Sequence, residues 1–385
     1  MKKKVLIVAT VASMIDQFNK NNINILQKLG YEVHVATNFS KPGTITNQKS
    51  ADLINELKSK NVKCIQIDFA RSPFDIKSNI LSYKQLKELI TINKDYDLIH
   101  LHSPVGAAIG RLAINKNSKI KVVYTAHGFH FYKGSSIKNW LIYYPVEKIL
   151  ARKTDVLITI NEEDYQLASC KKLGKKIELV PGIGVDPQKF YPRLDNKKNE
   201  LKLRLGFDEN KIILTYIGEL SKRKNQEFLI NAIKDYQKKE KIQLVLVGLG
   251  RLEQDLKKIV EKNKLKNNVL FLGYRKDIAD VLGATDILIS TSYQEGLPVN
   301  ILEGMFSGKP ILVSDCRGNR DLIIDGINGY VYDIDNTEEF LKKLDLLVVS
   351  ENKRKKFAEK NTQLSIKYSK NEVSKIMERI YKLGE

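Results

Sequence analysis

Two glutamates separated by seven residues are the side chains of this chain best placed to do chemistry. Glu295 and Glu303 enclose the turn Gly296-Leu297-Pro298, between a strand-like apolar segment and a helical pattern over 300–306. Turn amides and a helix N-terminus favour a bound anion, and carboxylates accept hydrogen bonds from hydroxyl groups. An anion that carries several hydroxyls describes a nucleotide sugar. The alternative is a pair of helix-capping carboxylates.

A run of basic residues could serve the same ligand. It follows the strand-like segment 212–217 and Gly218, and its position at the carboxyl end of a strand favours diphosphate binding over a solvated charge run. A second strand and glycine turn at 244–250 lacks the dinucleotide fingerprint and the P-loop Lys-Ser/Thr pair. Its glycines make either a tight turn or a ligand contact. The basic residues are Lys222, Arg223 and Lys224.

The first half of the chain has a polar cluster after the strand-like segment 122–125. Two histidines and a glycine at a strand end favour a functional site over structural histidines. His100 and His102 alternate with a leucine at another strand end, and we interpret them as structural or cleft-lining rather than as metal ligands. Arg71, in a loop, either contacts a phosphorylated acceptor or is an ordinary surface arginine. The cluster consists of His127, His130, Tyr132 and Lys133.

The elements that position these residues alternate along the chain. Helical patterns such as 17–29, 82–93 and 253–266 separate short apolar runs of the kind that buried parallel strands show. This βαβ order occurs twice and predicts an α/β fold of two doubly wound, Rossmann-like domains, joined near 181–187. The predicted strands are 5–10, 33–37, 64–67, 98–102, 122–125, 156–159, 177–180, 212–217, 244–247, 269–272, 287–290 and 311–313.

Composition narrows the class of protein. A chain of 385 residues is too long for a single hydrophobic core, so two domains are expected. No apolar run approaches the roughly 20 residues that span a bilayer. The scattered Cys64, Cys170 and Cys316 form neither metal spacing nor a disulfide framework, which fits a cytosolic setting. The net charge of +20 would suit nucleic acid, a membrane or a phosphorylated substrate. Since no nucleic-acid motif is present, we expect no nucleic-acid partner.

The segments around these residues resemble the retaining glycosyltransferases of family 4. Those enzymes have the GT-B architecture, two doubly wound Rossmann-like domains with an interdomain cleft. The segment 125–132 is similar to the subgroup that builds capsular polysaccharides and exopolysaccharides. The segments that carry the resemblance are Tyr293-Gln294-Glu295-Gly296-Leu297-Pro298, Leu302-Glu303-Gly304-Met305, Gly308-Lys309-Pro310, Asp325-Gly326-Ile327-Asn328-Gly329 and 181–186.

The resemblance implies a role for each candidate residue. Glu295 would bind donor-sugar hydroxyls, Glu303 the ribose hydroxyls, and Lys224 the leaving diphosphate, while His127 would face the reacting sugar. His127, Glu295 and Lys224 form the expected catalytic set. The expected donor-binding set is Gly218, Arg223, Lys224, Glu295, Gly296, Leu297, Pro298, Val299, Asn300 and Glu303, and the acceptor-binding set is Arg71, His130, Tyr132 and Lys133.

The chain departs from the family pattern at two places. Glu219 follows Gly218 where the family often has arginine, so Arg223 or Lys222 would have to supply that charge. The segment 10–14 lacks the glycines that often follow the first strand of the family. Asp333 and Asp335 resemble a metal-binding pair, but two carboxylates alone hold a hard cation poorly. The implied mechanism needs no metal, and we expect no cofactor.

The sequence thus predicts a retaining transfer of a sugar from a nucleotide-sugar donor. We expect the donor to be UDP-linked, and N-acetylhexosamines are among the candidates for the transferred sugar. The acceptor would be a surface polysaccharide or a polyprenyl-diphosphate-linked oligosaccharide. We expect domains at 1–185 and 186–368, with a final helix at 369–385 that includes Leu383 and packs back on the first domain.

The protein would be cytoplasmic and peripheral at the inner membrane face, with the segment 138–153 either on anionic lipid or packed on the first domain. A GT-B epimerase or hydrolase, or a basic adaptor for membrane or nucleic acid, is the alternative.

Overall fold

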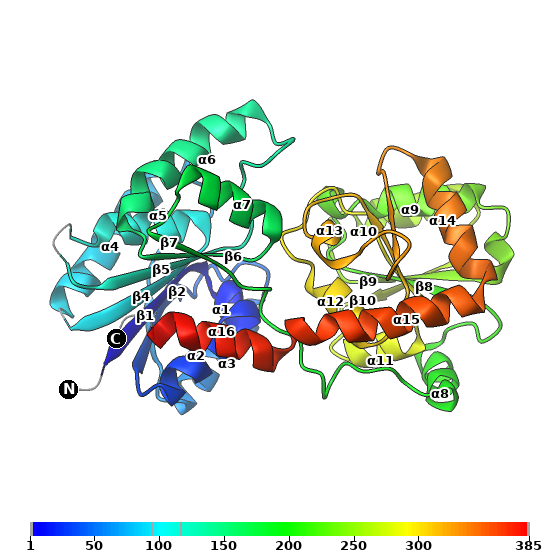
Figure 1. The fold of residues 1–385 in the computed structure, drawn as a ribbon, viewed down its shortest axis with the longest axis horizontal. Coiled ribbons are helices and arrows are strands. Elements are labelled where there is room, and N and C mark those ends of the chain that lie inside the picture. Colours follow the sequence, from blue (N-terminus) through cyan, green and yellow to red (C-terminus); the bar gives the residue numbers. More distant parts are fainter. Residues whose placement is uncertain (1–2, 94, 116–117, 383–385) are drawn as a thin grey trace. The chain divides into compact units, whose positions relative to one another are not determined.

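The computed structural model describes residues 3–93, 95–115 and 118–382. The chain divides into two compact units. Unit 1 contains Met1–Ile183 together with Val373–Glu385, and unit 2 contains Gly184–Glu372. Each unit is a parallel sheet with helices on both faces, which confirms the predicted α/β class (Figure 1).

Unit 1 is built on a parallel sheet that, within the described residues, has the order β3-β2-β1-β4-β5-β6-β7. The interior strand β1 is buried along almost all of its length because it carries Val5, Leu6, Ile7 and Val8 with helices on both sides. The strands are β1 (Lys4–Val11), β2 (Glu32–Asn38), β3 (Lys63–Gln66), β4 (Tyr96–His102), β5 (Lys121–Ala126), β6 (Val156–Thr159) and β7 (Lys176–Leu179).

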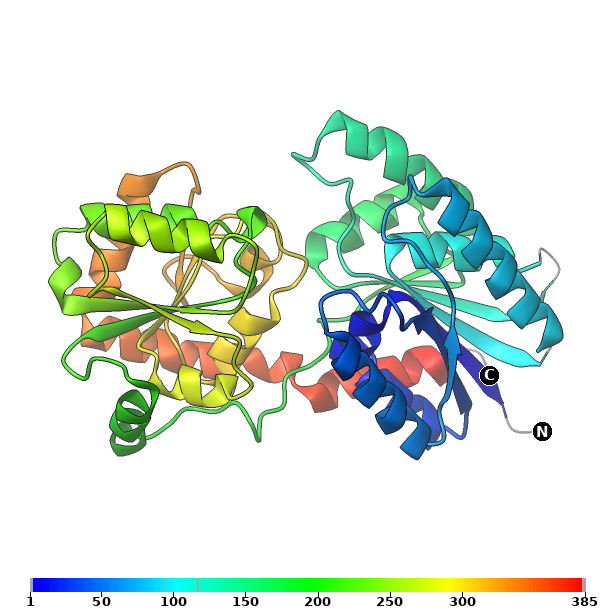
Figure 2. The same ribbon diagram turned by 180° about the vertical axis from the view of Figure 1, so that it is seen from behind.

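Two groups of helices cover the unit 1 sheet, one on each face (Figures 1 and 2). The first face carries α1 (Ala12–Phe18), α2 (Lys20–Lys28), α3 (Asn47–Ser59) and α16 (Lys370–Lys382), and the second carries α4 (Ile76–Ile92), α5 (Pro104–Ala113), α6 (Ile137–Leu150), the short 3₁₀ helix η1 (Ala151–Lys153) and α7 (Glu162–Lys171). Helix α16 buries Val373, Met377, Ile380 and Tyr381 in the core of unit 1. The expected Leu383 lies outside the described residues.

Unit 2 repeats the design with the strand order β10-β9-β8-β11-β12-β13 within the described residues. Its chain order switches between β8 and β11, the point at which doubly wound sheets bind ligands at their carboxyl edge. The strands are β8 (Ile212–Ile217), β9 (Ile242–Val247), β10 (Val269–Gly273), β11 (Ile287–Ser290), β12 (Ile311–Ser314) and β13 (Tyr330–Tyr332).

The helices of unit 2 also pack in two layers, with a larger core beneath α9, α10 and α14 and a smaller one beneath α8 and α11. The helices are α8 (Asp195–Leu205), η2 (Lys222–Lys224), α9 (Gln226–Asp235), η3 (Lys239–Lys241), α10 (Glu253–Lys262), α11 (Ile278–Ala284), α12 (Val299–Phe306), α13 (Asn319–Leu322), α14 (Thr337–Val349), α15 (Glu351–Ser365) and η4 (Ile366–Tyr368). No described helix combines the length and apolar character that crossing a bilayer requires.

Three helical predictions differ from the structure, and the helix expected at 253–266 already ends at Lys262. The pattern over 17–29 is not one helix, because the chain breaks at the fully buried Asn19, whose amide donates to the Met14 carbonyl at 3.1 Å. The helix expected at 82–93 begins earlier, at Ile76, where Asp75 caps it by accepting from the Ser78 amide. Its first turns carry exposed isoleucines, so they lack the apolar periodicity of a core-facing helix.

Candidate active site

The carboxyl end of β8 begins the candidate site in unit 2, and it packs closely against the glycine turn after β9. Gly218 donates its amide to Val247, and a Cβ on Gly218 would meet the Lys224 side chain at 3.4 Å. Gly248 has φ of +138°, and a Cβ there would lie 2.1 Å from the Gly218 oxygen. Backbone packing therefore explains the glycine at 248 in the 244–250 turn. The Lys224 side chain lies beside Gly218, where a Cβ would otherwise be.

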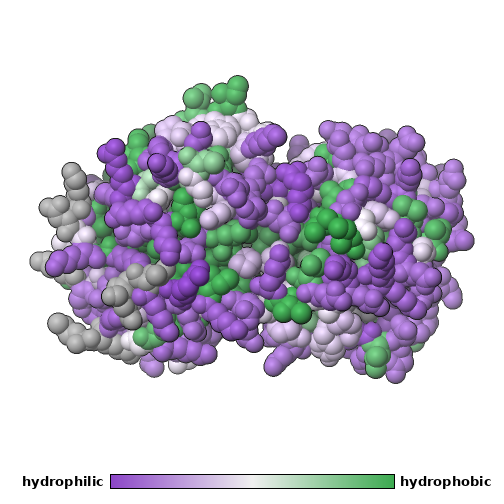
Figure 3. Space-filling model, in the orientation of Figure 1, coloured by the Kyte–Doolittle hydropathy of each residue, from purple (hydrophilic) through white to green (hydrophobic). Residues whose placement is uncertain are grey.

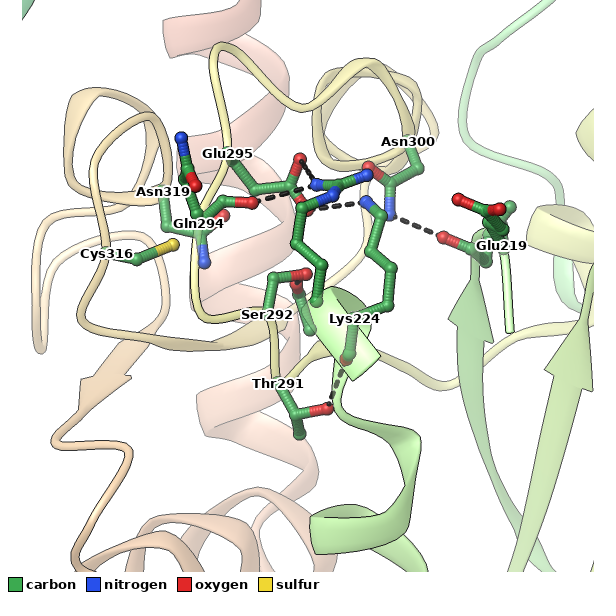
Figure 4. A network of polar contacts seen from close by, with 12 residues as sticks. Glu219, Lys224, Thr291, Ser292, Gln294, Glu295, Asn300, Cys316 and Asn319 are labelled. Atoms are coloured by element: carbon green, nitrogen blue, oxygen red, sulfur yellow. Dashed lines mark hydrogen bonds and ion pairs between the residues drawn. The ribbon is translucent and has the colours of Figure 1, made fainter. Parts of the chain in front are cut away.

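The loop after β8 is held in place, and against the loop after β11, by hydrogen bonds to its main-chain carbonyls. The buried Tyr216 hydroxyl donates to the Lys224 carbonyl at 2.9 Å, and Thr291 donates to the Asn225 carbonyl at 2.8 Å. The Tyr293 amide donates to the Arg223 carbonyl at 2.9 Å. Residues 70 positions apart are thus held side by side, and the side chains of η2 are brought to Glu295 (Figure 4).

Glu295 is the centre of the charged cluster. Lys224 Nζ lies 2.5 Å from Glu295 Oε1, and both side chains are about nine-tenths buried. Arg223 Nη1 lies 3.3 Å from Glu295 Oε2 and donates to the Gln294 carbonyl at 2.9 Å. Burial alone would raise the pKa of Glu295, but the charges of Lys224 and Arg223 outweigh it and hold the pKa below its usual value. Glu295 is therefore an ionised carboxylate at neutral pH.

Glu303 lies in the second turn of α12 and has different electrostatics. Burial raises the pKa of Glu303 to about 7, and the distant Lys189 offsets this only in part. Pro298 caps α12, and its carbonyl accepts from the Ile301 and Leu302 amides. The first amides of the helix have no acceptor inside it. The two glutamates thus differ in protonation at pH 7, which their spacing alone does not reveal.

The remaining predicted donor residues surround this helix start. Asn300 donates its side-chain amide to the Ile217 carbonyl at 2.8 Å and so ties α12 to the end of β8. Leu297 and Pro298 are buried, while Gly296 and Val299 are half-buried. A Cβ on Gly318 would lie 2.4 Å from the Gly296 oxygen, so the loop after β12 holds this turn in place.

The structure also shows where the charge expected near Glu219 is found. Glu219 is exposed at the end of β8, apart from the Glu295 cluster (Figure 4), and its carbonyl accepts from Gln226. Arg223 and Lys222 are both exposed, and it is Arg223 that contacts the Glu295 carboxylate, at 3.3 Å. Of the two basic residues considered as the replacement, Arg223 is therefore the one beside the candidate site.

Sequence reasoning missed one cation of this cluster. Arg317 is buried, and its Nε donates to the Glu295 main-chain carbonyl at 3.3 Å. It follows β12, the neighbour of β11 in the sheet. The sequence did offer a signal for Arg317, because it is a polar residue after a predicted strand. The carboxyl ends of parallel strands meet at one edge of a sheet, so such a residue is a candidate for the site.

In unit 1, His127 lies next to the two other histidines that end β4. His127 Nε2 and His102 Nδ1 are 3.1 Å apart, and the His100 and His102 ring centroids are 4.1 Å apart. Burial lowers the pKa of His127 to about 4 and that of His100 to about 3, so both are neutral at pH 7. His100 bonds the Tyr381 hydroxyl of α16, which agrees with a structural role, while His102 and His127 line a cavity of about 30 Å³.

The predicted acceptor residues separate into two places. Arg71 and His130 line one surface pocket of about 210 Å³, together with Thr10 and Ser103. Among the described residues, that pocket's lining includes neither Tyr132 nor Lys133, which lie in the turn before α6. Thr10, in the segment that lacks the family's glycines, accepts a hydrogen bond from the Gly106 amide of α5 at 3.1 Å.

Asp333 and Asp335 form a turn after β13. The Asp335 amide donates to the Asp333 carboxylate at 3.1 Å, and the Asp333 amide donates to Glu339. No group of three or more metal-ligating side chains occurs in the part of the chain that the structure describes.

Comparisons with known proteins agree with this geometry. The family model described as glycosyl transferase 4-like matches residues 4–161, and the model for glycosyl transferases group 1 matches residues 197–364. The EpsD protein of Bacillus subtilis strain 168, named as a glycosyltransferase, is 36% identical over 385 residues, which are 99% of this chain and 97% of EpsD.

A second relative is named for its reaction. The UDP-Gal:alpha-D-GlcNAc-diphosphoundecaprenol alpha-1,3-galactosyltransferase of Escherichia coli is 34% identical over 280 residues, 70% of each chain. Among solved structures, Anabaena HepE in complex with UDP and glucose has a TM-score of 0.78 at 18% identity, covering 99% of this chain and 100% of HepE. That likeness concerns the fold. This chain belongs to the GT-B glycosyltransferases of the group 1 and 4-like families.

Proposed function

We propose that this glycosyltransferase moves a sugar from a UDP-linked donor to a lipid-linked or polysaccharide acceptor, with retention of the anomeric configuration. The observation that carries the proposal is the buried Lys224–Glu295 pair at the carboxyl edge of the unit 2 sheet, with Arg223 beside it. The name of the Escherichia coli relative, which specifies UDP-galactose and a diphosphoundecaprenol acceptor, supports the classes of donor and acceptor.

The proposed chemistry follows from the charges. When the bond from the anomeric carbon to the diphosphate breaks, negative charge develops on the leaving group. Lys224 has three donors and uses one on Glu295, so it can bind the diphosphate without leaving the glutamate. Arg223 and the first amides of α12 add to this stabilisation. Glu295 accepts from the sugar hydroxyls, and Glu303 from the ribose hydroxyls.

Retention requires both bond changes on one face of the sugar. We propose that the leaving phosphate helps to deprotonate the acceptor hydroxyl and that His127 faces the reacting sugar. The neutral state of His127 suits a hydrogen-bonding role better than a charged one. Because basic side chains meet the diphosphate charge, we propose that transfer needs no metal.

The acceptor side of the proposal rests on unit 1. The pocket of Arg71 and His130 offers a cation and a ring to a phosphorylated acceptor. Helix α6 exposes Ile137, Leu141 and Ile149 by 79%, 71% and 71%. Figure 3 shows apolar surface over α6 at its upper edge. We propose that this surface, hereafter the α6 stripe, holds the protein peripherally at the cytoplasmic face of a membrane, where a polyprenyl-linked acceptor lies.

A panel of nucleotide sugars tests the proposal. UDP-linked sugars should raise the melting temperature more than GDP- or ADP-linked ones, because the donor binds only the folded state. The stabilising donor, incubated with undecaprenyl-diphosphate-linked N-acetylglucosamine, should give a product whose anomeric configuration matches the donor by NMR. EDTA should leave the rate unchanged. Conversion of the donor without acceptor would show an epimerase or hydrolase, and no stabilisation by any nucleotide sugar would contradict the proposal.

A further inference from the structure

A surface pocket of about 370 Å³ opens in unit 1 at the edge of the sheet opposite His127. Lys121 begins β5, Asp155 precedes β6 and Lys175 precedes β7, and all three line the pocket. His127 follows the other end of β5. Because these strands are parallel, the pocket lies at their amino ends and is separate from the candidate active site.

Positive charge dominates the described lining of this pocket. Asp155, the one carboxylate among the described lining residues, is already engaged, since Oδ2 accepts from the Val122 amide at 2.8 Å and Oδ1 pairs with Lys175 Nζ at 2.7 Å. Lys153 Nζ donates to the Arg111 and Ile114 carbonyls at 3.0 and 2.8 Å but keeps its charge. Within the described residues, five cations against one carboxylate leave a strong positive potential. The five basic side chains that line the pocket are Lys119, Lys121, Arg152, Lys153 and Lys175.

Lys121 is the side chain that points to a ligand. The residue is half-buried, but its Nζ atom is shielded from solvent and has no hydrogen-bond partner among the residues that the structure describes. Burial lowers the pKa of Lys121, Asp155 partly offsets this, and Lys176 adds to it. An ammonium shielded from water without an acceptor costs free energy. A bound anion would supply the missing acceptor.

The positive surface continues beyond this pocket. Arg152 and Lys175 also line an adjoining pocket of about 520 Å³, which includes Lys148 and Lys172. Arg152 follows the last turn of α6, close to Ile149 of the α6 stripe. An anion here would therefore lie next to the surface proposed to meet the membrane.

We propose that the basic pocket of Lys119, Lys121, Arg152, Lys153 and Lys175 is a second anion site of this protein. Its ligand is a phosphate group, carried either by an anionic lipid headgroup or by a soluble phosphate compound. The proposal concerns unit 1 alone and does not depend on which donor the unit 2 site binds.

The test compares full-length wild type with Lys121→Met and Arg152→Gln. Titration calorimetry with pyrophosphate, in the presence of saturating UDP, measures soluble binding. Co-sedimentation with phosphatidylcholine vesicles, with and without phosphatidylglycerol, measures binding to lipid. Lys258→Met removes one exposed lysine of α10 and is the matched control. Crystals soaked in tungstate locate the anion directly and cover the case of a variant that folds poorly.

We expect binding to fall about tenfold or more in Lys121→Met and Arg152→Gln, as loss of a charge-assisted hydrogen bond implies, and to stay unchanged in Lys258→Met. A loss confined to vesicles identifies a lipid headgroup as the source, and a loss confined to pyrophosphate identifies a soluble one. Equal binding by wild type and both pocket variants, with no tungstate at Lys121, would overturn the proposal. The nucleotide-sugar panel is unaffected by either result.

Discussion

Glu295 is surrounded by cations that act on different atoms. Lys224 and Arg223 contact its carboxylate, and Arg317 contacts its main-chain carbonyl. Glu303, eight residues later, has a pKa raised to about 7 by burial. One glutamate is thus held ionised by its neighbours, while the other is poised to change its charge near neutral pH.

The pKa of Glu303 gives a prediction about pH. Ribose hydroxyls donate hydrogen bonds to a carboxylate and so favour its ionised form, which the raised pKa makes scarce below pH 7. The affinity for UDP-glucose should therefore rise about tenfold between pH 6 and pH 8, with release of a proton on binding. Isothermal titration in buffers of different ionisation enthalpy measures both effects.

Glu303→Gln is the control for this pH dependence. It should bind UDP-glucose more weakly and with the same affinity across this range, because the glutamine does not titrate. Wild-type affinity that is independent of pH, or that weakens as the pH rises, would contradict the role of Glu303.

At the scale of elements, the site depends on loops that approach each other through glycine. The turns after β8 and β9 meet at Gly218 and Gly248, and the turns after β11 and β12 meet at Gly296 and Gly318. Adjacent parallel strands end at one edge, so their loops compete for the same space. Gly248 and Gly318 let the main chains of these neighbouring turns come closer than a Cβ would allow.

Gly248→Ala tests this packing. The substitution should lower the melting temperature and weaken nucleotide binding, because its Cβ would lie 2.1 Å from the Gly218 oxygen. Gly134→Ala is the matched control, since Gly134 has φ of +91° and open space around it. Both variants carry a backbone strain on the order of 1–3 kcal/mol, and only Gly248→Ala adds the clash. Equal losses of stability in urea denaturation would refute the argument.

Helix α6 uses two faces for two tasks. Trp140 and Tyr144 pack against Phe131, with ring centroids 5.4 and 5.6 Å away, so these aromatic residues belong to the core face. The α6 stripe of Ile137, Leu141 and Ile149 faces outward instead. The segment 138–153 therefore has residues suited to packing on the first domain and others suited to contact with lipid.

The α6 stripe gives a prediction about vesicles. Leu141→Ser and Ile149→Ser combined should weaken co-sedimentation with anionic vesicles by at least roughly tenfold, because each buried CH₂ contributes about 0.8 kcal/mol. The unfolding temperature should change little, since both side chains are exposed. Leu203→Ser on α8, 61% exposed in unit 2, should bind as the wild type does. Unchanged binding by the double variant would argue against the stripe.

At the scale of the whole molecule, the predicted α/β class is confirmed, and each predicted strand overlaps an observed one, whereas β13 was not among the predicted strands. A long apolar run such as that of β1 predicts a buried strand from the local sequence alone. The break at Asn19 and the Lys224–Glu295 pair could not be read from the sequence in the same way. Both depend on side chains that meet only after the chain folds, and Asn19 sits in a pattern that is otherwise continuous.

Helix α16 completes the core of unit 1, whose other described residues come from the first half of the chain. A chain that stops at Glu372 would lose four buried side chains from unit 1, each stabilising by about 1.5–3 kcal/mol. The sum is on the order of 6–12 kcal/mol, comparable with the total stability of a domain. We expect new proteolytic cuts throughout residues 3–183, detected by mass spectrometry, while residues 184–372 stay protected. A chain that ends at residue 382 should resist as the wild type does, and equal resistance of the shorter chain would contradict this.

The most direct test of the account is transfer by variants of the buried ion pair. Initial rates with the donor found by the panel should fall about 100-fold or more in Glu295→Gln and in Lys224→Ala, because each loses a group that acts on the sugar or its leaving diphosphate. Circular dichroism should show both variants folded, and Lys262→Ala, on the exposed side of α10, should keep full activity. Full activity in both Glu295→Gln and Lys224→Ala would contradict the assignment of the site.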